Sequence, residues 1–154
     1  MEKVESFELD HRYVKAPYVR KCCTLSGKNG DKITKFDLRF VQPNTSEMPT
    51  GAMHTIEHLL ANYLREFLDE VIDLSPMGCR TGFYLTLWND RNENEVRIAL
   101  EKSLKKVITT ECVPATNEIQ CGNFRDHSLF AAKEYAKLVL KNGINENYII
   151  KNSK

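Results

Sequence analysis

The stretch that decides the fold reads Gly51-Ala52-Met53-His54-Thr55-Ile56-Glu57-His58-Leu59-Leu60. Apolar side chains recur through it and beyond it at spacings of three and four, which predicts a helix over about residues 50–69; they are Met53, Ile56, Leu60, Tyr63, Leu64 and Phe67. Residues four apart share one helical face, so His54 and His58 can direct two imidazoles at one point.

The two histidines and Glu57 form an H-x-x-E-H pattern. Two neutral imidazoles one turn apart commonly hold a divalent transition metal. Glu57 lies beside that point, where a carboxylate can move protons for a molecule at the metal. The order inverts the H-E-x-x-H signature, and inverted versions occur among metallopeptidases. Short patterns also arise by chance, so a helix with two solvated histidines is the alternative.

Strand-like runs lie on both sides of this helix. Residues 17–25 and 32–41 are separated by a Gly-rich turn at 27–31, which predicts an antiparallel hairpin. Residues 83–88 form the most strand-like run of the chain, and residues 4–9 show an interrupted alternation of the same kind.

Two further helices are predicted, over about residues 93–109 and 128–140. Residues 75–82 contain one proline and two glycines and should form a loop, and residues 111–123 should be irregular. Strands and helices alternate without a regular βαβ order, so the predicted class is α+β.

Length and composition indicate a single domain spanning residues 1–154. The 22 Lys and Arg residues nearly balance the 21 Asp and Glu residues, which argues against a strongly basic nucleic-acid binder. No apolar run approaches the length of a membrane span, and residues 1–5 lack the apolar core of a signal peptide. We therefore expect a cytoplasmic protein. Its five cysteines are an odd number and should be free thiols in a reducing compartment.

A catalytic metal site usually takes three protein ligands and keeps one position open. Composition does not choose the third ligand among four candidates, which are Cys121, His127, His11 and Glu134. Two histidines and a cysteine would suit Zn²⁺ or Fe²⁺. Two histidines and a glutamate would indicate a peptidase instead.

Cys79 lies on the predicted loop between Gly78 and Arg80, and a neighbouring cation favours the thiolate. A buried, unreactive cysteine is the ordinary alternative. Other polar candidates have ordinary interpretations as surface groups; these are Ser6, His11 and Arg39. The remaining cysteines are expected to serve packing; these are Cys22, Cys23 and Cys112.

Several separate blocks, in order along nearly the whole chain, make it resemble the S-ribosylhomocysteine lyase family (LuxS, the autoinducer-2 synthases). The blocks are Asp10-His11 with Ala16-Pro17, Gly30-Asp31 with Phe36-Asp37-Leu38-Arg39-Phe40, His54-Thr55-Ile56-Glu57-His58-Leu59, Ser75-Pro76-Met77-Gly78-Cys79-Arg80-Thr81-Gly82-Phe83-Tyr84, and Gln120-Cys121-Gly122-Asn123 with His127-Ser128-Leu129.

The resemblance implies a role for each candidate residue. The metal ligands would be His54, His58 and Cys121, holding one Fe²⁺ per subunit that Zn²⁺ or Co²⁺ can replace. Cys79 and Glu57 would be the catalytic acid/base pair. The substrate pocket would contain Ser6, His11 and Arg39. The implied fold is an α+β domain whose antiparallel sheet has helices packed on one face, assembled as a homodimer with its sites at the interface.

The implied reaction converts S-ribosylhomocysteine to homocysteine, which returns to the methyl cycle, and 4,5-dihydroxy-2,3-pentanedione, the precursor of the quorum-sensing signal autoinducer-2. The carbonyl first migrates along the sugar, and β-elimination then expels homocysteine. Each proton transfer needs a Lewis acid for the enediolate oxygen and a base for the carbon-bound proton. Cys79 would move protons between carbons, and Glu57 would move them between oxygens.

Two other functions fit parts of the sequence. A zinc metallopeptidase with His54, His58 and Glu134 as ligands leaves Cys79 and Cys121 without roles. A binding domain with a structural zinc needs a fourth protein ligand and leaves Glu57 without a role.

Overall fold

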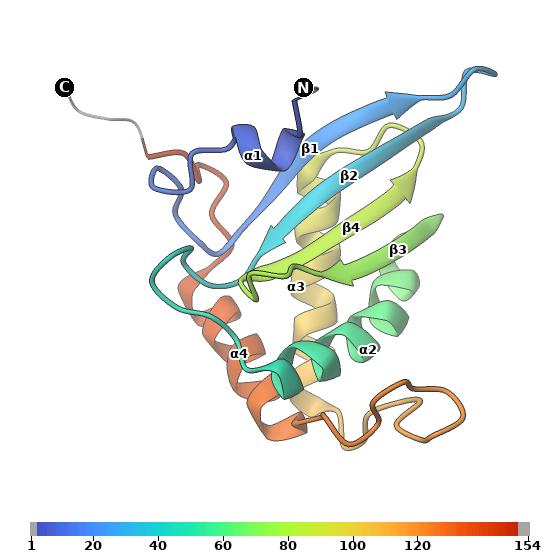
Figure 1. Cartoon of the computed structure of the whole chain (residues 1–154), viewed down its shortest axis with the longest axis vertical. Coiled ribbons are helices and arrows are strands. Elements are labelled where there is room, and N and C mark those ends of the chain that lie inside the picture. Colours follow the sequence, from blue (N-terminus) through green and yellow to red (C-terminus); the bar gives the residue numbers. More distant parts are fainter. Residues whose placement is uncertain (1–2, 151–154) are drawn as a thin grey trace.

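A computed structural model describes residues 3–150, which form one α+β domain. Its four strands make a single antiparallel sheet in the order β1-β2-β4-β3 (Figure 1). The strands are β1 (Tyr18–Ser26), β2 (Lys32–Arg39), β3 (Val71–Pro76) and β4 (Gly82–Trp88). The helices are α1 (Glu5–Glu8), α2 (Thr50–Phe67), α3 (Glu93–Thr109) and α4 (Leu129–Asn142).

The predicted hairpin is confirmed as β1 and β2. Gly30 has φ 89° in the turn between them, a conformation that glycine adopts without the steric cost of a Cβ. Along β2, Phe36 and Leu38 enter the hydrophobic core, while Asp37 and Arg39 lie on the opposite face. That polar face is not solvated at these positions, because Arg39 is 2% exposed and Asp37 is fully buried. The interpretation of Arg39 as an ordinary surface charge is therefore wrong.

The three long helices pack on one face of the sheet (Figure 1). Helix α2 contacts β3, α3 contacts β1, and the three helices also contact one another. The apolar spacing predicted for α2 supplies part of this core, with Ile56, Leu60 and Leu64 essentially buried. The short helix α1 instead contacts β1.

Other sequence predictions have mixed outcomes. Residues 4–9 do not form a strand: the helical turn α1 occupies most of them, and Glu5 pairs there with Arg20 of β1. Strand β3 continues to Pro76, so the loop before β4 is shorter than predicted. Cys112 is exposed, so its expected packing role is wrong. The predicted irregular segment is confirmed between α3 and α4.

A close backbone approach places the loop of residues 77–81. A Cβ atom on Gly82 would lie 2.2 Å from the carbonyl oxygen of Leu38, so only glycine lets β4 start this close to β2. The loop is then held by backbone bonds, from Phe40 N to Thr81 O at 2.9 Å and from Met48 N to Arg80 O at 2.8 Å. In the described part of the chain, no helix is both long and apolar enough to cross a membrane.

Candidate active site

Helix α2 and the segment between α3 and α4 together build a cluster of metal-ligating side chains. His54 and His58 come from α2, and Cys121 and His127 come from the segment that precedes α4. One donor atom from each residue lies within 4.8 Å of all the others. The Sγ atom of Cys121 lies 3.3 Å from Nε2 of His54.

Backbone carbonyls fix the tautomers of the two helical histidines. Nδ1 of His54 lies 3.0 Å from the carbonyl oxygen of Asp126, and Nδ1 of His58 lies 2.8 Å from that of Pro114. A carbonyl oxygen can only accept, so each Nδ1 carries the hydrogen and each Nε2 keeps its lone pair. This arrangement is typical of metal-binding histidines, and two such nitrogens with a thiolate fit a borderline divalent ion.

His127 is the fourth member of the cluster, although the family resemblance implies only three ligands. Its Nδ1 lies 3.1 Å from Oγ1 of Thr55, and its Nε2 lies 3.7 Å from Sγ of Cys121. Burial, followed by the neighbouring charges of His54 and His58, lowers the pKa of His127. The neutral imidazole is therefore favoured beside the other donors.

The other two candidates for the third ligand lie elsewhere. Glu134 pairs with Lys137 at 2.6 Å on the exposed surface of α4. His11 lines a cleft with Cys79. The tertiary structure thus brings Cys121 and His127 to the histidine pair and leaves Glu134 and His11 out of the cluster.

Glu57 opens into a cleft of about 310 Å³ next to the cluster. The walls of this cleft come from α2, from the end of β3, from the loop that follows, and from Asp126; they include His54, Glu57, Met77 and Arg80. Glu57 therefore lies beside the candidate metal position, as its place one residue before His58 predicts.

Cys79 opens into a different and larger cleft of about 630 Å³. His11, Arg39 and Thr81 also line it, together with residues 43–47. Gly78 and Arg80 line both clefts, so the loop that carries Cys79 lies between them. Within one chain, Cys79 and Glu57 thus face separate spaces.

Ser6 is set apart from the other predicted substrate residues. It is half-buried on α1, and among the described residues it is not one that lines either cleft. Its side chain lies at Tyr84, where burial raises the pKa of the phenol and a hydrogen bond with Ser6 opposes that rise.

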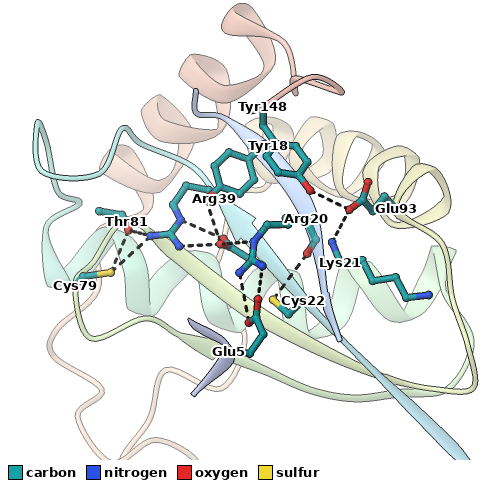
Figure 2. Close-up of polar contacts among 11 residues, drawn as sticks. Glu5, Tyr18, Arg20, Lys21, Cys22, Arg39, Cys79, Thr81, Glu93 and Tyr148 are labelled. Atoms are coloured by element: carbon teal, nitrogen blue, oxygen red, sulfur yellow. Dashed lines mark hydrogen bonds and ion pairs between the residues drawn. The ribbon is translucent and has the colours of Figure 1, made fainter. Parts of the chain in front are cut away.

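A buried polar network behind Cys79 is the feature that the sequence interpretation missed (Figure 2). The Arg39 guanidinium meets the Asp37 carboxylate through two hydrogen bonds of 3.1 and 2.8 Å. Asp37 also accepts from the Tyr18 hydroxyl at 3.1 Å and pairs with Nε of Arg20 at 3.5 Å. The available signal was the placement of opposite charges two residues apart on one strand, with another arginine on the paired strand.

Comparison with known proteins agrees with this geometry. The sequence model of the S-ribosylhomocysteinase (LuxS) family matches residues 4–149. A protein of Clostridium botulinum (strain Alaska E43 / Type E3) named S-ribosylhomocysteine lyase is 65% identical over 147 residues, covering 96% of this chain and 97% of that protein. Proteins of the same name are 64% identical in Clostridioides difficile (strain 630) and 59% identical in Enterococcus faecalis (strain ATCC 700802 / V583). These two matches cover 96% and 94% of this chain, and 97% and 94% of the respective relatives. With the family match extending over nearly every described residue, the chain belongs to the S-ribosylhomocysteine lyase (LuxS) family.

Proposed function

We propose that the protein is a metal-dependent carbon–sulfur lyase that cleaves S-ribosylhomocysteine to homocysteine and 4,5-dihydroxy-2,3-pentanedione. The family membership supports this substrate, since relatives of 59 to 65% identity carry the name S-ribosylhomocysteine lyase. The observation that carries the mechanism is the convergence of His54, His58 and Cys121, in which both histidines donate their Nδ1 hydrogens to backbone carbonyl oxygens. The sugar product would then serve as the autoinducer-2 precursor, and homocysteine would return to the methyl cycle.

His54, His58 and Cys121 are the proposed metal ligands. We propose Fe²⁺ as the resident ion, one per subunit, with Zn²⁺ or Co²⁺ able to replace it, because imidazole and thiolate suit all three. When bound, the ion supplies a Lewis acid that stabilises negative charge on a sugar oxygen.

Cys79 and Glu57 are the proposed proton carriers. The Cys79 sulfur is exposed in its cleft, and the positively charged Arg39 lies behind it with Nη1 at 3.9 Å. A thiolate in that position can take a proton from one sugar carbon and return it to the next. Glu57, beside the metal position, would move protons between the sugar oxygens and to the departing sulfur.

Because Cys79 and Glu57 open into separate clefts, we propose that the working site needs two chains. In a homodimer, the Cys79 cleft of one subunit would face the metal cluster of its partner. Each chain carries two large exposed apolar side chains that a contact between subunits would cover. Phe7 on α1 is 82% exposed, and Ile119, two residues before Cys121, is 91% exposed. His11 and Arg39 would bind the substrate in the Cys79 cleft, and we propose the same role for Ser6, which lies on α1 and does not line that cleft within one chain.

The metallopeptidase alternative receives no support. Its third ligand, Glu134, is on the surface of α4 and outside the donor cluster. The free state of all five cysteines agrees with a reducing compartment, and we propose that the protein acts in the cytoplasm.

The experiment that tests this function follows thiol release from S-ribosylhomocysteine with a thiol reagent. The metal-loaded protein should release one homocysteine per substrate, and removal of the metal by a chelator should stop the release. Cys112→Ala is the matched control for Cys79→Ala, since both cysteines are exposed. Wild-type rates in Cys79→Ala would refute the role of Cys79, and no thiol release by the metal-loaded wild type would refute the lyase itself.

A further inference from the structure

The Thr81 hydroxyl lies between a buried arginine and the exposed Cys79 (Figure 2). Its Oγ1 atom is 2.7 Å from Nη1 of Arg39 and 3.1 Å from Sγ of Cys79. Thr81 is 4% exposed, and its carbonyl oxygen accepts from the backbone N–H groups of Phe40 and Val41 at 2.9 and 3.2 Å. The hydroxyl is therefore held in place from both its backbone and its side chain.

The direction of these hydrogen bonds follows from the chemistry of the three groups. A guanidinium can only donate, so Oγ1 of Thr81 must accept from Arg39. The single hydrogen of the hydroxyl is then free to point at the sulfur of Cys79, which lies within hydrogen-bond distance. In this arrangement Thr81 is a donor to Cys79, and the sulfur is the acceptor.

Asp37 fixes which nitrogen of the Arg39 guanidinium faces Thr81. Its carboxylate takes Nε and Nη2 of Arg39, which leaves Nη1 facing Thr81 and Cys79. Burial by itself would lower the pKa of Arg39, but the hydrogen bonds and charge of Asp37 outweigh it and raise that pKa. The charged form of Arg39 is therefore favoured, and its orientation is fixed by Asp37, which is fully buried.

We propose that Thr81 is a positioning residue that presents the Cys79 sulfur to the cleft as a hydrogen-bond acceptor and so favours its thiolate form. The role rests on the proposed function, in which that thiolate moves protons between sugar carbons. A hydrogen bond donated to an ionised group stabilises it more than one to a neutral group. The neutral hydroxyl adds this stabilisation without adding a second charge to the wall of the cleft.

The test compares Thr81→Val, which keeps the shape and removes the hydroxyl, with Thr81→Ser, which keeps the hydroxyl. The rate of Cys79 alkylation by iodoacetamide is measured in metal-loaded protein by peptide mass spectrometry, from about pH 5 to about pH 9. Cys112 is exposed and provides an internal control in every sample. Thermal unfolding shows whether each variant is folded.

In Thr81→Val, Cys79 alkylation should slow by about three- to tenfold near neutral pH, since the lost thiolate is partly offset by its higher nucleophilicity. The rate profile should move to higher pH, while Thr81→Ser and the Cys112 rates stay near wild type. The other charged and titratable groups that line the cleft of Cys79 are Arg39 from β2, Arg80 from its own loop, His11 from the segment before β1, and Glu47 from the loop between β2 and α2. They are present in all variants and affect them alike.

An unchanged profile in Thr81→Val would overturn the proposal. So would an equal slowing in Thr81→Ser, because shape rather than the hydroxyl would then be responsible. The alkylation comparison decides the role of Thr81 even if Cys79→Ala kept full lyase activity, a result that would refute the assignment of Cys79 instead.

Discussion

The Sγ atom of Cys121 lies 3.3 Å from Nε2 of His54, although 67 positions separate the two residues in the sequence. Helix α2 supplies the histidine, and the irregular segment before α4 supplies the cysteine. Backbone carbonyl groups of the segment hold its ends to α2. The carbonyl oxygen of Asp126 accepts from Nδ1 of His54, and that of Pro114 accepts from Nδ1 of His58. The same contacts orient the two imidazoles and hold the segment so that the Cys121 sulfur lies beside them.

Replacing Cys121 with alanine should weaken metal binding by about tenfold or more, because the site loses its anionic ligand. His127 remains near the vacated position, so some metal can stay bound through three imidazoles. Elemental analysis after dialysis measures the loss, and Co²⁺-loaded protein should also lose its thiolate-to-metal absorption.

Two controls accompany this variant. Cys112→Ala removes an exposed thiol and should keep full metal, and Glu134→Ala should do the same because Glu134 is outside the cluster. Full metal content with an unchanged Co²⁺ spectrum in Cys121→Ala would exclude this residue as a ligand.

Replacing Glu57 with glutamine should leave the metal in place and lower turnover by roughly 10²- to 10⁴-fold, as expected for removal of a general acid/base. Glu57 lies beside the donor cluster without belonging to it, so the two effects should separate. Metal content and homocysteine release are measured on the same preparation. Glu66→Gln is the matched control, because Glu66 is on the same helix but pairs with Lys106 at the surface. Loss of metal in Glu57→Gln would show that Glu57 is a metal ligand and not a proton carrier.

Mixed dimers should show which residues share a site. If the Cys79 cleft of one chain completes the metal site of the other, mixing Cys79→Ala with Glu57→Gln chains should restore about a quarter of wild-type activity. Half of the dimers are then mixed, and each has one intact site of two.

The comparison pair is Cys79→Ala with Arg39→Ala, which should restore no activity because both residues line the same cleft of the same chain. Restoration by this second pair, or by neither pair in a mixture shown to exchange subunits, would contradict the two-chain site.

The ion pair between Glu5 and Arg20 should make part of the stability depend on pH. Burial raises the pKa of Glu5, but hydrogen bonding and charge from Arg20 outweigh it, so the pKa lies below its ordinary value of 4.5. A carboxyl group with a lowered folded-state pKa stabilises the fold above the unfolded pKa and loses that contribution as the pH falls through the folded one. Glu5→Gln should therefore lower the free energy of unfolding by about 1 kcal/mol or less at pH 7, because Glu5 is partly exposed. At a pH well below the folded-state pKa of Glu5, the substitution should have no effect.

Thermal unfolding of wild type and Glu5→Gln at about pH 7 and about pH 3 measures this difference. Glu8→Gln is the control, since Glu8 is on the same helical turn but pairs with the exposed Lys3. A difference between wild type and Glu5→Gln that persists undiminished at the lower pH would contradict the assignment.

The sequence by itself determined those features that depend on neighbours along the chain. The apolar spacing of residues 50–69 specifies α2, and the four-residue separation of His54 and His58 places both on one face of it. Alternation on each side of a glycine turn specifies the β1–β2 hairpin. Residues 4–9 show where such local patterns fail, because the contact between Glu5 and Arg20, 15 positions away, accompanies a helical turn in place of the strand.

Only the tertiary structure decided which distant side chains meet. It brought Cys121 and His127 to the histidine pair, buried the Arg39 charge against Asp37, and placed Cys79 and Glu57 in separate clefts. Periodicity along a chain reports the face on which a side chain lies, but not what packs against that face. Arg39 lies on the face of β2 opposite the hydrophobic core, yet it is buried because Asp37 compensates its charge there.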